Sequence, residues 1–473
     1  MADGTTPEFS TGIDILAAQR AAFLQAGAPN LNARRDALKR LKNAIRSESK
    51  RLQAAAMADF GNRAPVETSL IDLGPTVQAI HHMRANLKRW MAPKHRPVSW
   101  LMQPGRARVH YQPLGVVGIL SAWNYPVALS LVPLATALAA GNRAMIKPSE
   151  LAPATADALR DMLAGIFPQE EVAVLSGGAD VAAAFSALPF DHLLFTGSTA
   201  VGRHVMRAAA DTLTPVTLEL GGKSPVILAP DADLDLLARD LAFAKTVNAG
   251  QTCIAPDYLL ALPDQVEPLS EALIAKIRES FPGGLADPNL TTIISEQHLA
   301  RLRDLLEDAR AKGARIVEAF PAGSNSAHPR ALSPALVLDA TPEMRIMQEE
   351  IFGPFLPVIA RESVADSIDF VNARPRPLAL YIYGKDRAAV DNVLQRTTSG
   401  NATVNGCMLH YAVESLPFGG VGDSGIGAYH GVEGFRRLSH AKGIFHPGKR
   451  HGSRLLHAPY GRLARLATKF MLR

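Results

Sequence analysis

Apolar and polar positions near the start of the chain follow a helical period. Between residues 31 and 59 apolar side chains recur every three or four positions, with Arg and Lys on the opposite face; they are Leu38, Leu41, Ala44, Ile45 and Leu52. This spacing predicts an amphipathic helix. A stretch rich in Pro and Arg, 93–108, then interrupts the pattern and indicates an excursion from the domain.

Short apolar runs alternate with helical stretches from about residue 114 onwards. Strands are predicted at 114–120, 144–147, 172–175, 192–195 and 215–220, with helices at 127–140, 154–166, 179–187 and 202–210. A second alternating region has strands at 226–228, 258–262, 335–338, 355–359, 379–382 and 402–404. Such alternation predicts parallel sheets covered by helices, which bind ligands at the carboxyl ends of their strands. The predicted fold class is therefore α/β, with two domains.

Composition and charge narrow the class of protein. The chain has 473 residues, 47% of them hydrophobic and 20% charged, which excludes a mostly disordered or fibrous chain. Taken alone, the formal charge of +6 suggests that the protein binds nucleic acid or a membrane surface. However, residues 441–473 carry eight basic residues and no acidic one, which leaves residues 1–440 at −2. No nucleic-acid partner is expected, because the basic character belongs to the tail.

Within that tail, apolar residues again fall at helical spacing; they are Leu456, Tyr460, Leu463, Ala467 and Phe470. A basic amphipathic helix can lie on an anionic membrane or pack on its own dimer. Packing is favoured, because surface helices usually bury their apolar face on protein.

The remaining signals point to a reducing compartment. The N-terminus lacks the basic and apolar regions of a secretory signal, and the apolar stretch 127–140 is too short to span a bilayer. Two cysteines, Cys253 and Cys407, form neither a disulfide framework nor a four-cysteine zinc site. A cytoplasmic protein with free thiols and no metal is expected.

Three glycine-containing motifs resemble phosphate-binding loops. Gly420, Gly422 and Gly425 match G-x-G-x-x-G, but no apolar strand precedes them and no acid follows Glu433, so the Rossmann interpretation fails. The segment 222–224 lacks the first glycine of a P-loop. The segment 195–202 is better placed, because it closes a strand and opens a helix. Two interpretations of this segment are equally supported: a binding site for a pyrophosphate, and an ordinary strand-to-helix turn capped by a hydroxyl.

Several reactive side chains follow the predicted strands. Cys253 follows Gly250-Gln-Thr, Glu219 lies inside an apolar strand, and Asn124 follows another. A buried acid suits a general base and an amide can hold an oxyanion, although an inert thiol, a surface-facing acid and a turn asparagine are the simpler alternatives. Lys147 and Glu150 follow the second strand. Two interpretations are open for them: contacts to a ribose, or an ion pair exposed at the surface.

Taken together, the motifs resemble the NAD(P)-dependent aldehyde dehydrogenase superfamily. The resemblance runs from about 30 to about 447 and rests on eight segments in order, at 113–118, 123–126, 140–150, 195–202, 218–225, 250–253, 349–354 and 416–420. Gln-Thr-Cys253-Ile-Ala-Pro-Asp-Tyr258 and Tyr429-His-Gly431 are similar to the class 3 branch. Within that branch the overall similarity favours the coniferyl aldehyde dehydrogenases.

This resemblance implies roles for individual residues. Cys253 would attack the aldehyde, Asn124 and the Cys253 N–H would hold the oxyanion, and Glu219 would act as base. The cofactor would be NAD, with NADP as an alternative, on a variant Rossmann sheet, and its implied contacts are Trp123, Lys147, Glu150, Gly197, Ser198, Glu350 and Phe352. Tyr125 and Phe418 would line the substrate tunnel, with Met408, Leu409 and Tyr411 as further candidates.

The resemblance also implies a domain plan and a substrate class. The cofactor-binding domain would comprise 1–92 and 115–218, the catalytic domain 219–417, and a small β oligomerisation arm with its tail 93–114 and 418–473. A homodimer is expected. The apolar tunnel residues favour a hydrophobic aldehyde, aromatic and coniferyl-like, with a medium- or long-chain aliphatic aldehyde as the alternative.

Overall fold

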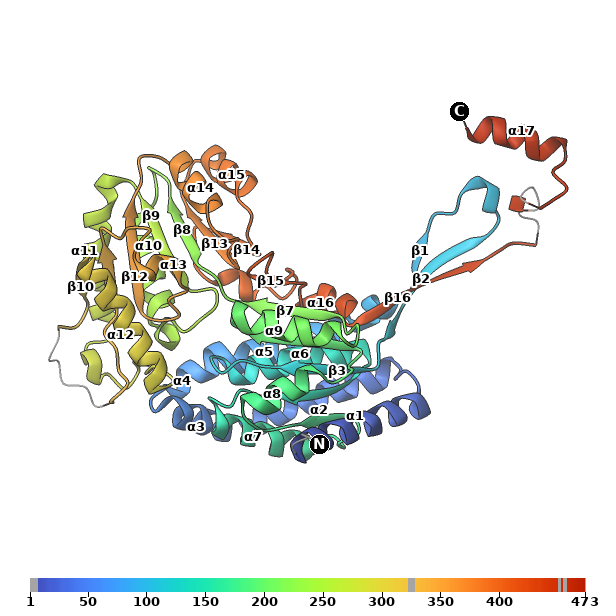
Figure 1. The fold of residues 1–473 in the computed structure, drawn as a ribbon, viewed down its shortest axis with the longest axis horizontal. Coiled ribbons are helices and arrows are strands. Elements are labelled where there is room, and N and C mark those ends of the chain that lie inside the picture. Colours follow the sequence, from blue (N-terminus) through green and yellow to red (C-terminus); the bar gives the residue numbers. More distant parts are fainter. Residues whose placement is uncertain (1–6, 322–327, 450–451, 454–456, 473) are drawn as a thin grey trace, which may run out of the picture.

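A computed structural model of the chain describes residues 7–321, 328–449, 452–453 and 457–472. Two α/β units lie side by side, and a narrow arm projects from one of them (Figure 1). Both units contain a largely parallel sheet, which confirms the predicted α/β class.

The first unit is built on a six-stranded sheet. Its order is β15-β7-β6-β3-β4-β5, and all neighbours are parallel except β15 with β7. The strands are β3 (Val116–Leu120), β4 (Arg143–Lys147), β5 (Val172–Val174), β6 (His192–Gly197), β7 (Val216–Leu220) and β15 (Gly425–Ile426). The chain adds β4 and β5 on one side of β3, then β6 and β7 on the other. The strand order therefore reverses between β3 and β6, where open α/β sheets bind ligands.

Helices cover both faces of this sheet because its strands are apolar on both. Val117 and Ile119 of β3 pack with one group of helices, whereas Val116 and Leu120 pack with the other. The first group is α2 (Leu31–Ser47), α5 (Gly74–Met91), α6 (Pro126–Ala140) and α7 (Pro153–Ala164). The second is α1 (Pro7–Ala26), α8 (Ala179–Ser186) and α9 (Thr199–Ala210).

The predicted helix over 31–59 is divided. Glu48 ends α2 with φ −91° and ψ 6°, and α3 (Ser49–Phe60) starts in a new direction along α7. Short turns α4 (Pro65–Glu67) and η1 (Thr68–Leu73) connect α3 to α5. The helical character predicted over 31–59 is confirmed, with a break at Glu48 that periodicity alone does not show.

The second unit contains a seven-stranded sheet of order β10-β11-β12-β9-β8-β13-β14, antiparallel only between β10 and β11. Its strands are β8 (Ser224–Leu228), β9 (Pro256–Ala261), β10 (Arg315–Glu318), β11 (Ala335–Leu338), β12 (Phe355–Ala360), β13 (Ala379–Tyr383) and β14 (Asn401–Val404). Its helices are α10 (Leu234–Thr246), η3 (Val247–Gly250), α11 (Pro263–Ser280), η4 (Gly284–Ala286), α12 (Glu296–Ala311), α13 (Arg345–Gln348), α14 (Val364–Asn372), α15 (Arg387–Arg396) and η5 (Leu409–Ala412).

The arm is a three-stranded antiparallel sheet. Strands β1 (Lys94–Arg96) and β16 (Ser439–His446) flank β2 (Arg106–Pro113), with η2 (Trp100–Met102) between β1 and β2. The Pro- and Arg-rich excursion is thus one hairpin of this sheet. At the end of the arm lies α17 (Arg462–Met471), shown in red in Figure 1, with Leu463 and Leu466 exposed. Leu456 and the side chain of Phe470 lie outside the described residues.

The predicted domain bounds stay a prediction, but one of them falls inside a strand. Strand β7 runs through the bound between 218 and 219 and crosses into the second unit only at Gly221 and Gly222. Part of 418–473 also joins the first unit rather than the arm, since β15 pairs with β7 and α16 (Gly431–Arg437) packs on α5 and α6. Among the described residues, no helix has the length and apolar character needed to cross a membrane.

Candidate active site

An apolar cavity of about 210 Å³ lies where the two units meet. Asn124, Tyr125 and Glu219 line it from the first unit, and Cys253 lines it from the second. Phe418 and the other three tunnel candidates, Met408, Leu409 and Tyr411, line it as well. The structure therefore brings together the three residues to which a chemical role was assigned from the sequence.

Cys253 is half-buried on a loop of unusual backbone geometry. Asn248, Ala249 and Gly250 have φ values of 51°, 52° and 69°, so three consecutive residues adopt the left-handed region. Burial, then the nearby carboxyls of Glu350 and Glu219, raise the pKa of the Cys253 thiol to about 12. The thiol is therefore protonated at neutral pH, and it needs a base before it can act as a nucleophile.

Glu219 faces the interior of the molecule, so it is not the surface-facing acid of the simpler alternative. Its side chain is 3% exposed, and neither carboxyl oxygen has a hydrogen-bond partner among the described residues. Burial raises its pKa well above the usual value of a glutamate. A carboxylate whose pKa is raised is a stronger base than an exposed glutamate, as proton transfer in a buried site requires.

Asn124 is held from both its side chain and its backbone. Its Nδ2 donates to the carbonyl of Gln251 at 3.1 Å, so the amide points at the loop that carries Cys253. Its own carbonyl accepts from Nη1 of Arg63 at 3.1 Å and from Nδ2 of Asn248 at 3.0 Å. Since an amide nitrogen carries two protons, one remains for a ligand in the cavity.

Four of the implied cofactor contacts stand at the carboxyl ends of β4 and β6. Gly197 ends β6, and Ser198 caps α9 by accepting a hydrogen bond from the N–H of Val201 at 3.3 Å. Lys147 ends β4 with its side chain 2% exposed and pairs with Glu150 at 2.8 Å. The lysine of this pair is therefore buried, whereas the Glu150 side chain is 45% exposed. None of the four lines the apolar cavity.

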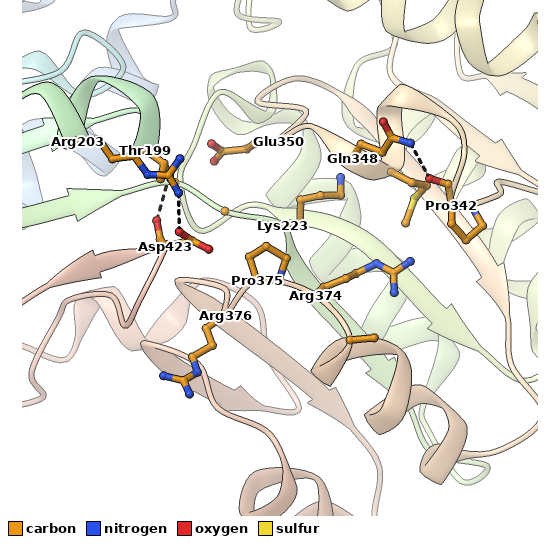
Figure 2. Close-up of a pocket in the computed structure, with 14 residues that line it drawn as sticks. Thr199, Arg203, Lys223, Pro342, Gln348, Glu350, Arg374, Pro375, Arg376 and Asp423 are labelled. Carbon is orange, nitrogen blue, oxygen red and sulfur yellow. Dashed lines mark hydrogen bonds and ion pairs between the residues drawn. The ribbon is translucent and has the colours of Figure 1, made fainter.

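A second cleft of about 620 Å³ opens at the segment that leaves β7 (Figure 2). Glu350 reaches into it beside Gly221 and Gly222, and Arg203 pairs with Asp423 at its edge at 2.9 Å. A side chain on Gly221 would overlap the Glu350 carboxyl. Burial is the main cause that raises the pKa of Glu350 to about 8.

Lys223 explains why the segment 222–224 only imitates a P-loop. Its Nζ donates to Asp257 at 2.6 Å and to the carbonyls of Ile346 and Glu349 at 2.7 and 3.0 Å. With its three donors used, this lysine anchors the crossing between the units rather than a phosphate.

Trp123 and Phe352 pack against each other, although they come from different units. Their ring centroids are 5.4 Å apart, and Trp123 also contacts His298 at 5.1 Å. Phe352 has a φ of 50°, in the left-handed region that residues other than glycine rarely adopt.

Sequence reasoning missed part of the site. Arg63 and Asp72, both buried, and the largely buried Glu67 form a charged group beneath Asn124. Leu70, Ile71 and Phe243 contribute to the cavity wall. These residues fall in a short polar stretch or on a helix, where the pattern carries no sign that the charges are buried. The burial of these charges becomes visible only in the folded structure.

The described residues fit a dinucleotide. A strand ends at Gly197 and a capped helix begins at Ser198, which is an arrangement that accepts a pyrophosphate. Lys147 and Glu150 offer a donor and an acceptor beside it, and the Glu350 carboxyl lies within the second cleft. Gly420, Gly422 and Gly425 instead form the turn that leads into β15.

Comparison with known proteins gives the family context. Residues 12–444 match the Aldehyde dehydrogenase family. A Pseudomonas aeruginosa protein named probable coniferyl aldehyde dehydrogenase is 48% identical over 97% of this chain and 96% of its own length. A mouse protein named aldehyde dehydrogenase family 3 member A2 is 40% identical over 89% of this chain and 86% of its own.

Solved structures of aldehyde dehydrogenases are similar in fold to this chain. Staphylococcus aureus AldH in a substrate-bound state superposes with a TM-score of 0.90 at 34% identity, covering 97% of this chain and 99% of that one. The Mycobacterium tuberculosis aldehyde dehydrogenase complexed with NAD+ gives 0.83 at 29% identity, covering 93% and 91%.

Proposed function

Because the chain belongs to the aldehyde dehydrogenase family, we propose that it oxidises an aromatic, coniferyl-like aldehyde to the carboxylic acid with NAD. The observation that carries the proposal is the meeting of Cys253, Glu219 and Asn124 in one apolar cavity. A nucleophile, a base and an oxyanion donor are the three groups that this chemistry requires.

The first step forms a bond between Cys253 Sγ and the aldehyde carbon. Because burial raises the pKa of the thiol to about 12, its proton must pass to a base. Glu219 is the carboxyl that shares the cavity, and it takes this proton in its carboxylate form, after it has released its own proton to solvent. The carbonyl π electrons move to oxygen, which the Asn124 amide and the Cys253 N–H stabilise as an oxyanion. The product is a thiohemiacetal on Cys253.

Oxidation then converts the thiohemiacetal to a thioester. As the oxyanion held by Asn124 re-forms its C=O bond, a hydride leaves the former aldehyde carbon. Bound NAD would supply the acceptor for this hydride, and Glu350 with Phe352 would hold its nicotinamide ribose. Glu219 first releases to solvent the proton that it took from Cys253. The carboxylate then takes a proton from water, which attacks the thioester carbon and displaces the Cys253 thiolate. The leaving thiolate takes up the proton from Glu219, and the carboxylic acid departs. Coenzyme A is not needed because Glu219 activates water.

The cofactor is proposed to lie along the carboxyl edge of the first sheet. Gly197 and Ser198 would contact the pyrophosphate, with Lys147 and Glu150 at the adenosine ribose. The carboxyl of Glu350 would hold the nicotinamide ribose beside Phe352 and Trp123. An acid at the ribose disfavours a 2′-phosphate, which supports NAD, while the neighbouring lysine keeps NADP as the alternative.

The wall of the cavity supports a hydrophobic substrate. Tyr125, Phe418 and Tyr411 provide aromatic surface, and Leu70 and Ile71 provide aliphatic surface. A flat aromatic aldehyde suits this lining. A medium- or long-chain aliphatic aldehyde remains the second candidate, because the same surface accepts methylene groups.

Initial rates against matched aldehydes test this proposal. Coniferyl aldehyde, benzaldehyde and C6–C16 alkanals are compared with NAD and NADP separately, without coenzyme A. A kcat/KM highest for the coniferyl compound with NAD supports the proposal. A preference for long alkanals favours the second candidate, and acid formation that depends on coenzyme A would contradict water as the acceptor.

We propose that the chain forms a homodimer through its arm, within the cytoplasm. The exposed apolar side chains of α17 and its basic residues Arg462, Arg465 and Lys469 support a role in contact with a partner surface. The unpaired state of Cys253 and Cys407 supports a reducing compartment. Sedimentation of the full chain and of a chain ending at Gly448 tests the dimer, and addition of anionic vesicles tests membrane contact. A full chain that sediments as a monomer would overturn the dimer.

A further inference from the structure

A fully buried arginine lies directly beneath the oxyanion donor. Arg63 precedes α4, and its side chain has no exposed surface. Its Nη1 donates to the carbonyl of Asn124 at 3.1 Å. The guanidinium also lies over the rings of Phe60 and Tyr125, with its carbon 4.8 and 5.1 Å from their centroids. A cation in such a place is costly unless other groups compensate it.

Two acids near Arg63 offset its charge, and each also holds the backbone of the site. Asp72 is fully buried and its carboxyl is within the electrostatic influence of Arg63, whereas the Glu67 side chain is 13% exposed. Glu67 lies 3.5 Å from Nε of Arg63, and its Oε1 accepts from the N–H of Asn248 at 3.2 Å and from Thr291 Oγ1 at 2.9 Å. Asp72 accepts from the N–H of Ala128 at 2.6 Å, in the first turn of the helix that follows Asn124. The charged group therefore touches both the nucleophile loop and the oxyanion loop.

The nucleophile loop needs such support. Asn248 and Ala249 are not glycines, yet both adopt the left-handed region that non-glycine residues disfavour. Backbone of this kind persists only where its surroundings fix it. Asn248 is fixed twice: its N–H donates to Glu67, and its Nδ2 donates to the carbonyls of Asn124 and Gln251 at 3.0 and 3.1 Å.

Arg63 and Asn248 thus donate to the same carbonyl oxygen, that of Asn124. Two donors fix the orientation of that peptide, and with it the direction of the Asn124 side chain. The amide of Asn124 returns a hydrogen bond to Gln251, two residues before Cys253. A closed set of contacts therefore connects Arg63, the oxyanion donor and the nucleophile loop.

We propose that Arg63 is a positioning residue, which acts through Asn124 and, with Glu67, sets the oxyanion donor and Cys253 to face the same point of the cavity. The inference rests on the proposed function. Arginine suits the task because its planar fork presents one nitrogen to the Asn124 carbonyl and another to Glu67, whereas lysine offers a single flexible point.

Arg34 provides a matched control for the loss of a buried guanidinium. It is 4% exposed and donates to the carbonyls of Pro29 and Ala139 at 2.9 and 3.0 Å, but it lies on α2 and lines neither the apolar cavity nor the second cleft. Arg63→Met and Arg34→Met each remove a cation that donates to backbone carbonyls. A purely structural role for Arg63 predicts that both variants lose stability and keep kcat.

The experiment measures kcat, the KM for NAD and the melting temperature of both variants. We expect Arg63→Met to lower kcat by about 10²-fold, as for a misplaced oxyanion donor, with the KM for NAD little changed. Arg63→Lys should recover part of kcat. Arg34→Met should keep kcat despite a lower melting temperature. Equal kcat values in the two Met variants would overturn the proposal.

A double-mutant cycle tests whether Arg63 acts through Asn124. In the Asn124→Ala background, Arg63→Met should cost far less than in the wild type, because the donor that it positions is gone. If the fold losses of kcat in the two single variants multiply in the double variant, the proposal is overturned.

A second measurement follows the alkylation rate of Cys253 by iodoacetamide, read by peptide mass without aldehyde. This rate should change in Arg63→Met and not in Arg34→Met; an unchanged rate in Arg63→Met would contradict the proposal. If wild type oxidises no aldehyde, the proposed function fails, while this alkylation comparison still judges the role of Arg63.

Discussion

Glu219 lies directly opposite Gly425 in the antiparallel pair formed by β7 and β15. The residue proposed as the base is therefore held in a strand that has neighbours on both sides, β6 and β15. Gly425 is also the last glycine of the G-x-G-x-x-G segment, so this motif closes the sheet beside Glu219 instead of binding a dinucleotide.

Gly425→Ala should damage both stability and activity. A side chain on Gly425 would overlap the carbonyl oxygen of Leu218, and the φ of 149° already disfavours any residue but glycine. We expect the free energy of unfolding to fall by about 2 kcal/mol or more, and kcat to fall with it. Gly443→Ala in β16 is the control, because nothing lies within 4 Å of its added carbon. Equal melting temperatures for the two variants would show that the β7–β15 pair is not needed.

Glu219→Gln should stabilise the protein while removing its turnover. Burial raises the pKa of Glu219, so the folded state keeps a proton that the unfolded state releases above the usual glutamate pKa. Wild-type stability is therefore lost as pH rises from that value, and the amide avoids this loss. We expect Glu219→Gln to unfold at a higher temperature than wild type at pH 7.5, and the difference to vanish near pH 4. Thermal unfolding at both pH values measures it, and a lower melting temperature at pH 7.5 would contradict the burial argument.

The affinity for NAD should depend on the ionisation of Glu350. Burial raises the pKa of this carboxyl to about 8, so it is protonated at pH 7 in the free protein. If the carboxylate form accepts hydrogen bonds from the nicotinamide ribose, the Kd for NAD decreases as pH rises towards 8 and levels off above it. Titration by protein fluorescence between pH 6 and 9 measures this, and Glu350→Gln should show a flat profile. A flat wild-type profile argues against the ribose contact.

Glu150→Gln should shift the cofactor preference towards NADP. The carboxylate of Glu150 is 2.8 Å from Lys147 and repels a 2′-phosphate. Removing its charge leaves the lysine free to attract that phosphate, so we expect the ratio of kcat/KM for NADP to NAD to rise by about tenfold. Steady-state rates with both cofactors measure the ratio. An unchanged or lower ratio would place the ribose elsewhere.

The fold could be predicted from the sequence because its strands are short apolar runs separated by clear helical periods. The gathering of Cys253, Glu219 and Asn124 could be expected only from the resemblance and its motifs, since each residue taken alone had a simpler interpretation. Their roles stay predictions, although the cavity brings the three together.

The charged group beneath the cavity could not be predicted, for a physical reason. Arg63, Glu67 and Asp72 are polar letters in a local pattern, and polar residues are expected at the surface. They are buried because they pair with one another and with backbone groups more than 50 positions away, including those of Asn124 and Ala128. Only the tertiary structure provides these partners. The exposed α17 likewise shows that an amphipathic pattern predicts a helix but not what covers it.

The central claim is that Cys253 carries the aldehyde through a thioester to the acid. It is tested by measuring carboxylic acid and NADH formed from coniferyl aldehyde and NAD, without coenzyme A, by wild type, Cys253→Ala and Cys407→Ala. Cys407 is the matched thiol, because it lies buried at the wall of the same cavity. We expect equal amounts of acid and NADH from wild type, the same balance at a rate reduced by less than about tenfold from Cys407→Ala, and neither product from Cys253→Ala. Acid and NADH formed by Cys253→Ala at the wild-type rate would contradict the mechanism.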